Sequence, residues 1–130
     1  MRRRVSSAAA GLAGLALAAS PAFGCGHCIE DKVAAVYDHA VITKALDLDH
    51  RMAFFALEGA LPAGADVRRL LARALTSAKG VDSPSLRLSV SSASLSLSYD
   101  GKRISPGQIM DTLNRKLAAR GLSVSLLEPQ

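Results

Sequence analysis

Cys25 and Cys28 enclose the tetrad Cys25-Gly26-His27-Cys28, which contains both cysteines of the 130-residue chain and one of its three histidines. Two thiolates separated by two residues can bind a soft metal ion or close to a disulfide, and the imidazole of His27 offers a third ligand. Sulfur ligands select Cu(I) or Zn(II) over hard ions, and a site with two or three protein ligands suits Cu(I) better than the four-ligand shell of structural zinc. The sequence therefore predicts a metal site at Cys25, Cys28 and His27, with Cu(I) as the first candidate and Zn(II) as the second.

The tetrad directly follows a segment that is typical of a secretory signal peptide. Residues 2–4 are arginines, residues 8–19 form a short apolar run of alanine, leucine and glycine, and residues 20–24 supply the small residues of a cleavage site. The apolar run is shorter than the roughly 20 residues that span a bilayer. We therefore expect residues 1–24 to be a signal peptide and the mature protein to be exported, to the periplasm or another extracytoplasmic location.

Two alternatives concern the N-terminus that cleavage of the signal peptide would create. A lipoprotein signal also ends immediately before a cysteine, so a lipid anchor at Cys25 stays open, although Ala22 and Phe23 depart from the residues usual in such signals. Cleavage before Cys25 without lipidation would make His27 the third residue. The free amine, two backbone amides and that imidazole could then form a square-planar site for Cu(II) or Ni(II), which acylation of the amine would abolish.

The charge of the chain does not favour nucleic-acid binding. Removing the arginines of residues 2–4 from the 16 basic residues leaves 13 against 11 acidic ones, a net charge of +2. The basic residues are scattered, and aromatic residues make up only 4% of the chain. Arg68, Arg69 and Arg73 are interpreted as a solvated helix face.

The pattern of apolar residues predicts the elements that must position the tetrad. Spacings of three and four indicate amphipathic helices, whereas strict alternation or a short apolar run indicates strands. The expected elements, in order, are helix 28–46, strand 52–57, helix 66–79, strands 86–91 and 94–99, a helix that follows Ser105-Pro106 and ends at Gly121, and strand 122–126. This order and the short connections predict an α+β fold, a ferredoxin-like βαββαβ sandwich preceded by an additional N-terminal amphipathic helix.

The expected organisation has three parts. They are the signal peptide at 1–24, the Cys-Gly-His-Cys motif with the N-terminal helix at 25–50, and the ferredoxin-like domain at 51–128. The alternating serines of the strands are predicted to face solvent. The apolar stripe of the first helix would cover the open face of the sheet or pack on another molecule. In a homodimer formed through that helix, two Cys25-Cys28 pairs would come together and could complete a four-sulfur site.

The other histidines are poor candidates for additional ligands. His39 lies eleven residues beyond Cys28, which is roughly 16 Å along a straight helix. His50 is predicted to be a solvated turn residue between the helix and the first strand. Met52 and Met110 fall on apolar stripes and are predicted to belong to the core.

Residues of the predicted sandwich resemble the heavy-metal-associated (HMA) domains of copper chaperones and metal-transporting ATPases. The resemblance covers about Met52 to Leu127 and rests on these segments: Leu57-Glu58-Gly59, the helix that leads through Arg69, Ala74 and Leu75 into Lys79-Gly80-Val81, the strand Leu95 to Asp100, and Ser105-Pro106 with Ile109 before Gly121. The resemblance implies a ferredoxin-like fold, soft-metal binding, and a protein that donates or accepts the metal.

The metal ligands of that family cannot be carried over to this chain. Members of the family hold their metal with a Cys-x-x-Cys in the loop after the first strand, at the start of the following helix. The corresponding residues here, 59–66, contain no cysteine, methionine or histidine. The cysteine pair of this chain instead precedes the additional N-terminal helix, and its use as the metal site is a hypothesis.

Other functions stay open. The tetrad Cys-Gly-His-Cys is the active-site sequence of some disulfide isomerases of the thioredoxin superfamily, so thiol-disulfide chemistry is an alternative, although that fold needs a strand leading into the motif. A structural Cys25–Cys28 disulfide would close too short a loop to stabilise the fold much. A non-catalytic interaction module is the third alternative. We find no paired carboxylates, serine nucleophile motif or phosphate-binding loop, so an enzyme is less expected than a binding protein.

Overall fold

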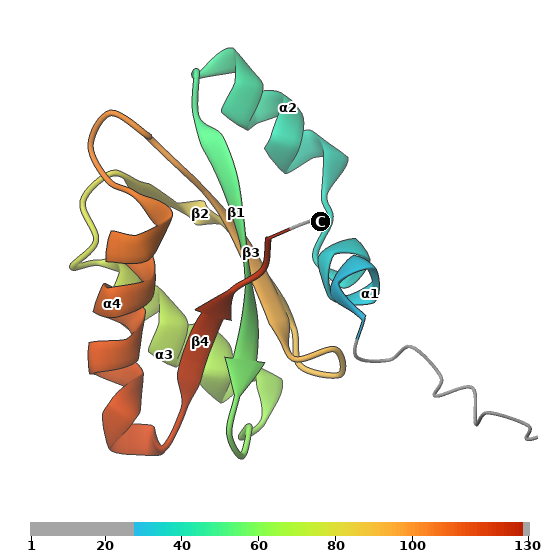
Figure 1. The fold of residues 1–130 in the computed structure, drawn as a ribbon, viewed down its shortest axis with the longest axis vertical. Helices are drawn as coiled ribbons and strands as arrows, with labels where there is room; N and C mark the ends of the chain where they lie inside the picture. Colours follow the sequence, from blue (N-terminus) through green and yellow to red (C-terminus); the bar gives the residue numbers. More distant parts are fainter. Residues whose placement is uncertain (1–27, 129–130) are drawn as a thin grey trace, which may run out of the picture.

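The computed structural model describes residues 28–128 (Figure 1). The predicted signal peptide, Cys25 and His27 lie outside these residues. The elements, in order, are α1 (Ile29–Ala35), α2 (His39–Asp47), β1 (Arg51–Glu58), α3 (Gly64–Leu75), β2 (Val81–Ser89), β3 (Ser94–Tyr99), α4 (Pro106–Leu117), the short 3₁₀ helix η1 (Ala118–Arg120) and β4 (Ser123–Leu126). From β1 onward the order is βαββαβ, which confirms the predicted ferredoxin-like sandwich. No helix within residues 28–128 is long and apolar enough to cross a membrane.

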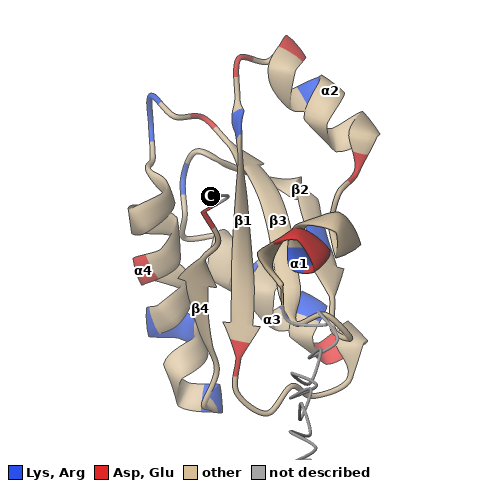
Figure 2. Cartoon of the chain, turned by 45° about the vertical axis from the view of Figure 1, so that its right-hand side comes forward, with Lys and Arg blue, Asp and Glu red and all other residues tan. Residues whose placement is uncertain are grey.

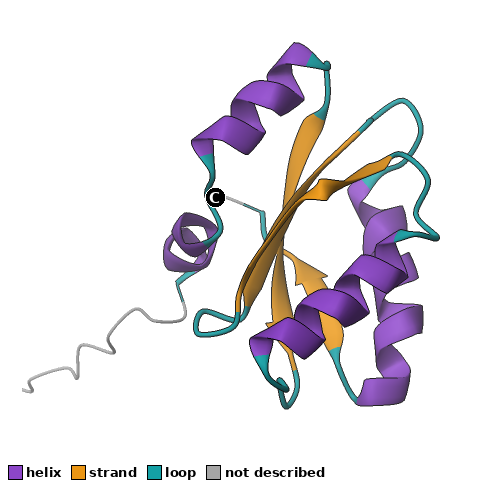
Figure 3. Ribbon diagram, turned by 180° about the vertical axis from the view of Figure 1, so that it is seen from behind, coloured by secondary structure: helices purple, strands orange, loops and turns teal. Residues whose placement is uncertain are grey.

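The four strands form one sheet in the order β2-β3-β1-β4, and all neighbouring strands are antiparallel. In the central pair, β1 and β3, Phe55 faces Leu95 and Ala56 faces Ser94. Helices α3 and α4 cover one face of the sheet, and α1 and α2 lie on the other (Figure 3). The strands β1 and β3 are therefore covered on both sides.

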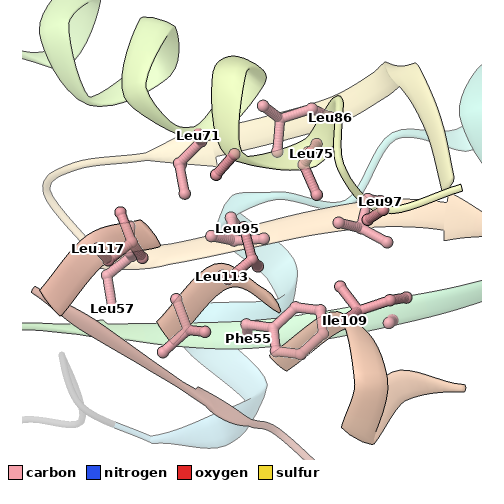
Figure 4. Packing of buried hydrophobic residues seen from close by; sticks show 14 of the residues in the cluster. Phe55, Leu57, Leu71, Leu75, Leu86, Leu95, Leu97, Ile109, Leu113 and Leu117 are labelled. Atoms are coloured by element: carbon pink, nitrogen blue, oxygen red, sulfur yellow. The ribbon is translucent and has the colours of Figure 1, made fainter. Parts of the chain in front are cut away.

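The core lies between the sheet and the helices α3 and α4 (Figure 4). Alternate residues of β1 and β3 point into it, and each helix presents one apolar stripe, as the residue spacings predict. The largest fully buried apolar side chains are Phe55, Leu71, Leu75, Leu95, Leu97, Ile109, Leu113 and Leu117. Burying one such side chain contributes roughly 1.5–3 kcal/mol, so this layer supplies most of the stability that holds the sheet in place.

The segment before the sheet differs from the prediction of one continuous helix over 28–46. The chain forms two helices, because the helix is interrupted between Ala35 and His39. The Asp38 carboxylate accepts hydrogen bonds from the backbone N–H groups of Ala40 (2.9 Å) and Val41 (3.3 Å). An acceptor side chain at this position stabilises a new helix start. The break also turns the buried Val36 toward the sheet.

The predicted solvent exposure of the β3 serines is wrong. Ser94, Ser96 and Ser98 are at most 1% exposed. Ser94 Oγ donates to the carbonyl of Lys32 at 2.8 Å, and Ser96 Oγ donates to the carbonyl of Val36 at 2.8 Å. The serine face is buried because residues 28–47 lie across it. We call these residues the strap. The serine hydroxyls supply hydrogen-bond donors for buried backbone carbonyls of the strap.

Candidate metal site

Of the three predicted ligands, Cys28 alone lies within the described residues. It is half-buried and occupies the position before α1, where its backbone is extended (φ −66°, ψ 146°). Its carbonyl accepts a hydrogen bond from the N–H of Lys32 at 3.1 Å, which closes the first turn of α1. The start of the strap therefore has a defined conformation from Cys28 onward.

Polar contacts of the strap place Cys28 at one end of the sheet. The ammonium group of Lys32 donates to the carbonyl of Ser92 at 2.6 Å, in the turn between β2 and β3. The same turn lies beside the last residues of β1, because the N–H of Leu57 donates to the carbonyl of Ala93 at 2.8 Å. Cys28 is one helical turn before Lys32. It therefore lies near the end of the sheet at which β1 finishes, which we call the exit end. Figures 1 and 2 show the start of α1 close to the turn between β2 and β3.

The two helices of the strap are held by different forces. No residue of α1 is buried, so its fixed position depends on the hydrogen bonds made by Lys32 and by the hydroxyl of Ser94. In α2, Val41 and Ala45 are buried and supply apolar contact. The part of the strap that carries Cys28 is thus fastened by polar contacts, each worth roughly 0.5–1.5 kcal/mol, and by little apolar packing.

An ion pair anchors the corner between the two strap helices. Arg87 Nε, on the edge strand β2, lies 2.8 Å from Asp38 Oδ2. The Arg87 hydrogen bond, followed by the one from the N–H of Val41, holds the pKa of the Asp38 carboxyl below its ordinary value of 3.8. The charged form of Asp38 is therefore favoured in the folded chain, where it also caps α2.

This shift predicts the pH dependence of stability. Because folding lowers the pKa of Asp38, the carboxylate stabilises the folded state above its unfolded pKa, and this contribution is lost as the pH falls through the lowered value. We expect the free energy of unfolding, measured by denaturant titration from about pH 5 to about pH 2, to fall more steeply for the wild type than for Asp38→Asn. Equal pH slopes for the two proteins would contradict the assignment.

The remaining histidines do not lie with Cys28. His39 is exposed at the start of α2, beyond the break. His50 precedes β1, and the eight residues of β1 separate it from the exit end by roughly 25 Å. The prediction that His50 is solvated is wrong, because it is half-buried and its Nδ1 atom is buried without a hydrogen-bond partner among residues 28–128. Asp49, immediately before it, has a left-handed backbone conformation (φ 56°), and the N–H of His50 donates to the carbonyl of Ala45 at 2.7 Å.

No group of three or more His, Cys, Asp or Glu side chains within residues 28–128 is arranged to hold a metal ion. Met110 packs against the core, as predicted, and Met52 is partly buried.

Sequence reasoning did not identify Lys32, Ser94 and Ser96 as the residues that position the strap. The period-two serines were the only signal of this role, and alternation alone does not show which face a neighbouring segment covers.

Comparisons with known proteins give similarity in structure alone. No protein-family model and no curated protein sequence matches the chain. The crystal structure of oxidized MerP from Ralstonia metallidurans CH34 is 13% identical, with 61% of this chain and 99% of that chain covered at a TM-score of 0.45. The solution structure of the N-terminal domain of a potential copper-translocating P-type ATPase from Bacillus subtilis, in the Cu(I)-loaded state, is 16% identical. That comparison covers 62% of this chain and 99% of that chain at a TM-score of 0.47.

Proposed function

We propose that this chain is an exported soft-metal-binding protein that holds Cu(I) through Cys25 and Cys28, with His27 as a further ligand and Zn(II) as the second candidate metal. The observation that supports this proposal is the position of Cys28. The contacts of Lys32 and Ser94 hold the start of the strap at the exit end. The β1–α3 loop, which is the loop where HMA domains carry their thiols, starts at this same end of the sheet. A cysteine pair that is distant in sequence from that loop would thus act at the same end of the sheet.

The ligand set suits transfer of the ion as well as binding. Two thiolates and an imidazole leave a coordination position open on a soft ion, which a thiolate of a partner could occupy. The metal could then pass between proteins by exchange of one ligand at a time. The proposed partner is therefore a protein that donates or accepts the metal.

The proposed location is the periplasm or another extracytoplasmic space. A lipid anchor at Cys25 and a two-thiolate site exclude each other, because the lipid is attached through the cysteine sulfur. The mass of the N-terminal peptide of the exported protein distinguishes them: a free cysteine at residue 25 agrees with the metal site, and a lipidated one contradicts it.

Titration of the reduced exported protein with Cu(I) against a competing chelator tests the proposed function. We expect one Cu(I) to bind for each chain. The matched control is the same protein after its thiols have been alkylated with iodoacetamide, which should bind none. The proposal fails if the reduced protein takes up neither Cu(I) nor Zn(II). Reduction of insulin by the metal-free protein would instead favour the thiol-disulfide alternative.

A further inference from the structure

A second feature of the exit end lies on the other side of the sheet from the strap. A hollow of about 360 Å³ opens between the β1–α3 loop, α3 and η1. Its polar lining consists of Arg69 and Arg73 on α3, Arg120 at the end of η1, and Asp66. Figure 2 shows basic segments on α3 and at the end of α4. We propose that this hollow binds an oxyanion with two or more negative charges, such as a phosphate group or a dicarboxylate.

The charges of the hollow are not balanced within the structure. Arg69 pairs with Asp66, at 2.9 Å between Nη2 and Oδ1. The guanidinium groups of Arg73 and Arg120 have no hydrogen-bond or ion-pair partner among residues 28–128. Three positive groups and one negative group therefore line the hollow, an excess of two charges. An oxyanion with two charges would neutralise this excess, and guanidinium groups bind such anions with paired, charge-assisted hydrogen bonds.

The backbone holds the walls of the hollow together before any ligand binds. Gly59, at the start of the β1–α3 loop, has a φ of +114°, and a Cβ atom there would lie 2.5 Å from the carbonyl oxygen of Gly121. The loop and the residue after Arg120 are thus packed backbone to backbone. Because this contact fixes Arg120 beside α3, the three arginines are brought together by the fold, although 47 positions separate Arg73 from Arg120.

The position of the hollow also argues against a cation. The β1–α3 loop forms one wall through Ala60 and Pro62, and neither residue offers a side chain that could bind a metal ion. In this chain the arginines would repel a metal ion from that place. The positive end of α3, a helix of 12 residues that starts at Gly64, adds to the attraction of an anion. The excess of positive charge therefore supports an anion at this site.

Chemical-shift titration of the ¹⁵N-labelled exported chain tests the proposal. The probes are inorganic phosphate and succinate, each added at an ionic strength held constant with chloride. We expect saturable shifts for the backbone amides of Ala60, Asp66 and Arg120. The variant Arg73→Gln with Arg120→Gln should weaken binding at least about tenfold, since it removes the two unpaired charges. Saturation by phosphate, by succinate or by both supports the site and identifies which oxyanion it prefers.

A matched control variant keeps the test specific. Arg103 and Arg115 line another hollow, of about 350 Å³, between the segment that follows α3 and the helix α4. The variant Arg103→Gln with Arg115→Gln removes the same total charge and should leave binding within about twofold of the wild type, as expected for surface residues away from the site. The proposal is overturned if both pairs weaken binding equally, or if chloride alone produces the same shifts. All four arginines are exposed, so the variants should fold.

Discussion

The variant Cys28→Ser is expected to bind Cu(I) at least about a hundredfold more weakly than the wild type. Loss of a residue that merely supports a metal ligand already lowers affinity by about 10–100-fold, and Cys28 is proposed as a direct ligand. Serine also replaces a soft, ionisable sulfur with a hard, neutral hydroxyl, which binds a soft ion poorly. The same loss is expected for Cys25→Ser, measured by competition with a chelator of known Cu(I) affinity.

The structure predicts that Cys28→Ser leaves the fold intact. Cys28 occupies the position before α1, where serine is favoured over most residues, and its side chain is only half-buried. The free energy of unfolding should therefore stay within about 0.5 kcal/mol of the wild type. The matched control for the metal titration is His39→Ala, an exposed substitution that should not change Cu(I) affinity. Unchanged affinity in Cys28→Ser would refute the proposed ligand set.

The elements of the sandwich were predictable because their signals are local. Leu95 and Leu97 alternate with serine, and this period of two gives the strand directly. The start of α4 was visible in Ser105-Pro106, and the structure shows a complete capping box there with Gln108. A pattern of this kind depends on residues a few positions apart, so the rest of the chain does not alter it.

The arrangement of the strap could not be predicted in the same way. An alternating serine face normally indicates solvent, and its burial depends on contacts with Lys32 and Val36 about 60 residues earlier in the chain. The break at Asp38 had a local signal, since aspartate is a common helix cap, but the apolar stripe continues through it. The candidate ligands were likewise visible in the sequence, whereas the position of Cys28 at the exit end depends on the distant Ser92.

The variant Ser96→Val is expected to lower the free energy of unfolding by about 2–6 kcal/mol. The Ser96 hydroxyl is fully buried and donates to the carbonyl of Val36. Its removal leaves a buried carbonyl without a donor, at a cost of about 1–3 kcal/mol. The added carbon atom must also fit between the sheet and the strap, and overpacking typically costs 1–3 kcal/mol. Denaturant titration measures the sum.

The matched control is Ser125→Val on β4, which pairs with β1 on the side opposite β3. Ser125 is partly exposed, and its hydroxyl makes a single long contact with Glu58, at 3.3 Å. The same substitution there should change stability by about 0.5 kcal/mol or less. Equal effects at both positions would mean that the Ser96 hydrogen bond does not hold the strap.

Amide hydrogen exchange shows which part of the molecule responds to Ser96→Val. If the hydroxyl fastens the strap, exchange should accelerate first in α1 and α2, whereas the amides that join β1 and β3 stay protected until global unfolding. Cu(I) affinity should fall less than in Cys28→Ser, because both thiols remain and the variant changes only how firmly Cys28 is held at the exit end. If amide exchange accelerates uniformly across the sheet, Ser96 stabilises the whole core and has no specific part in positioning the strap.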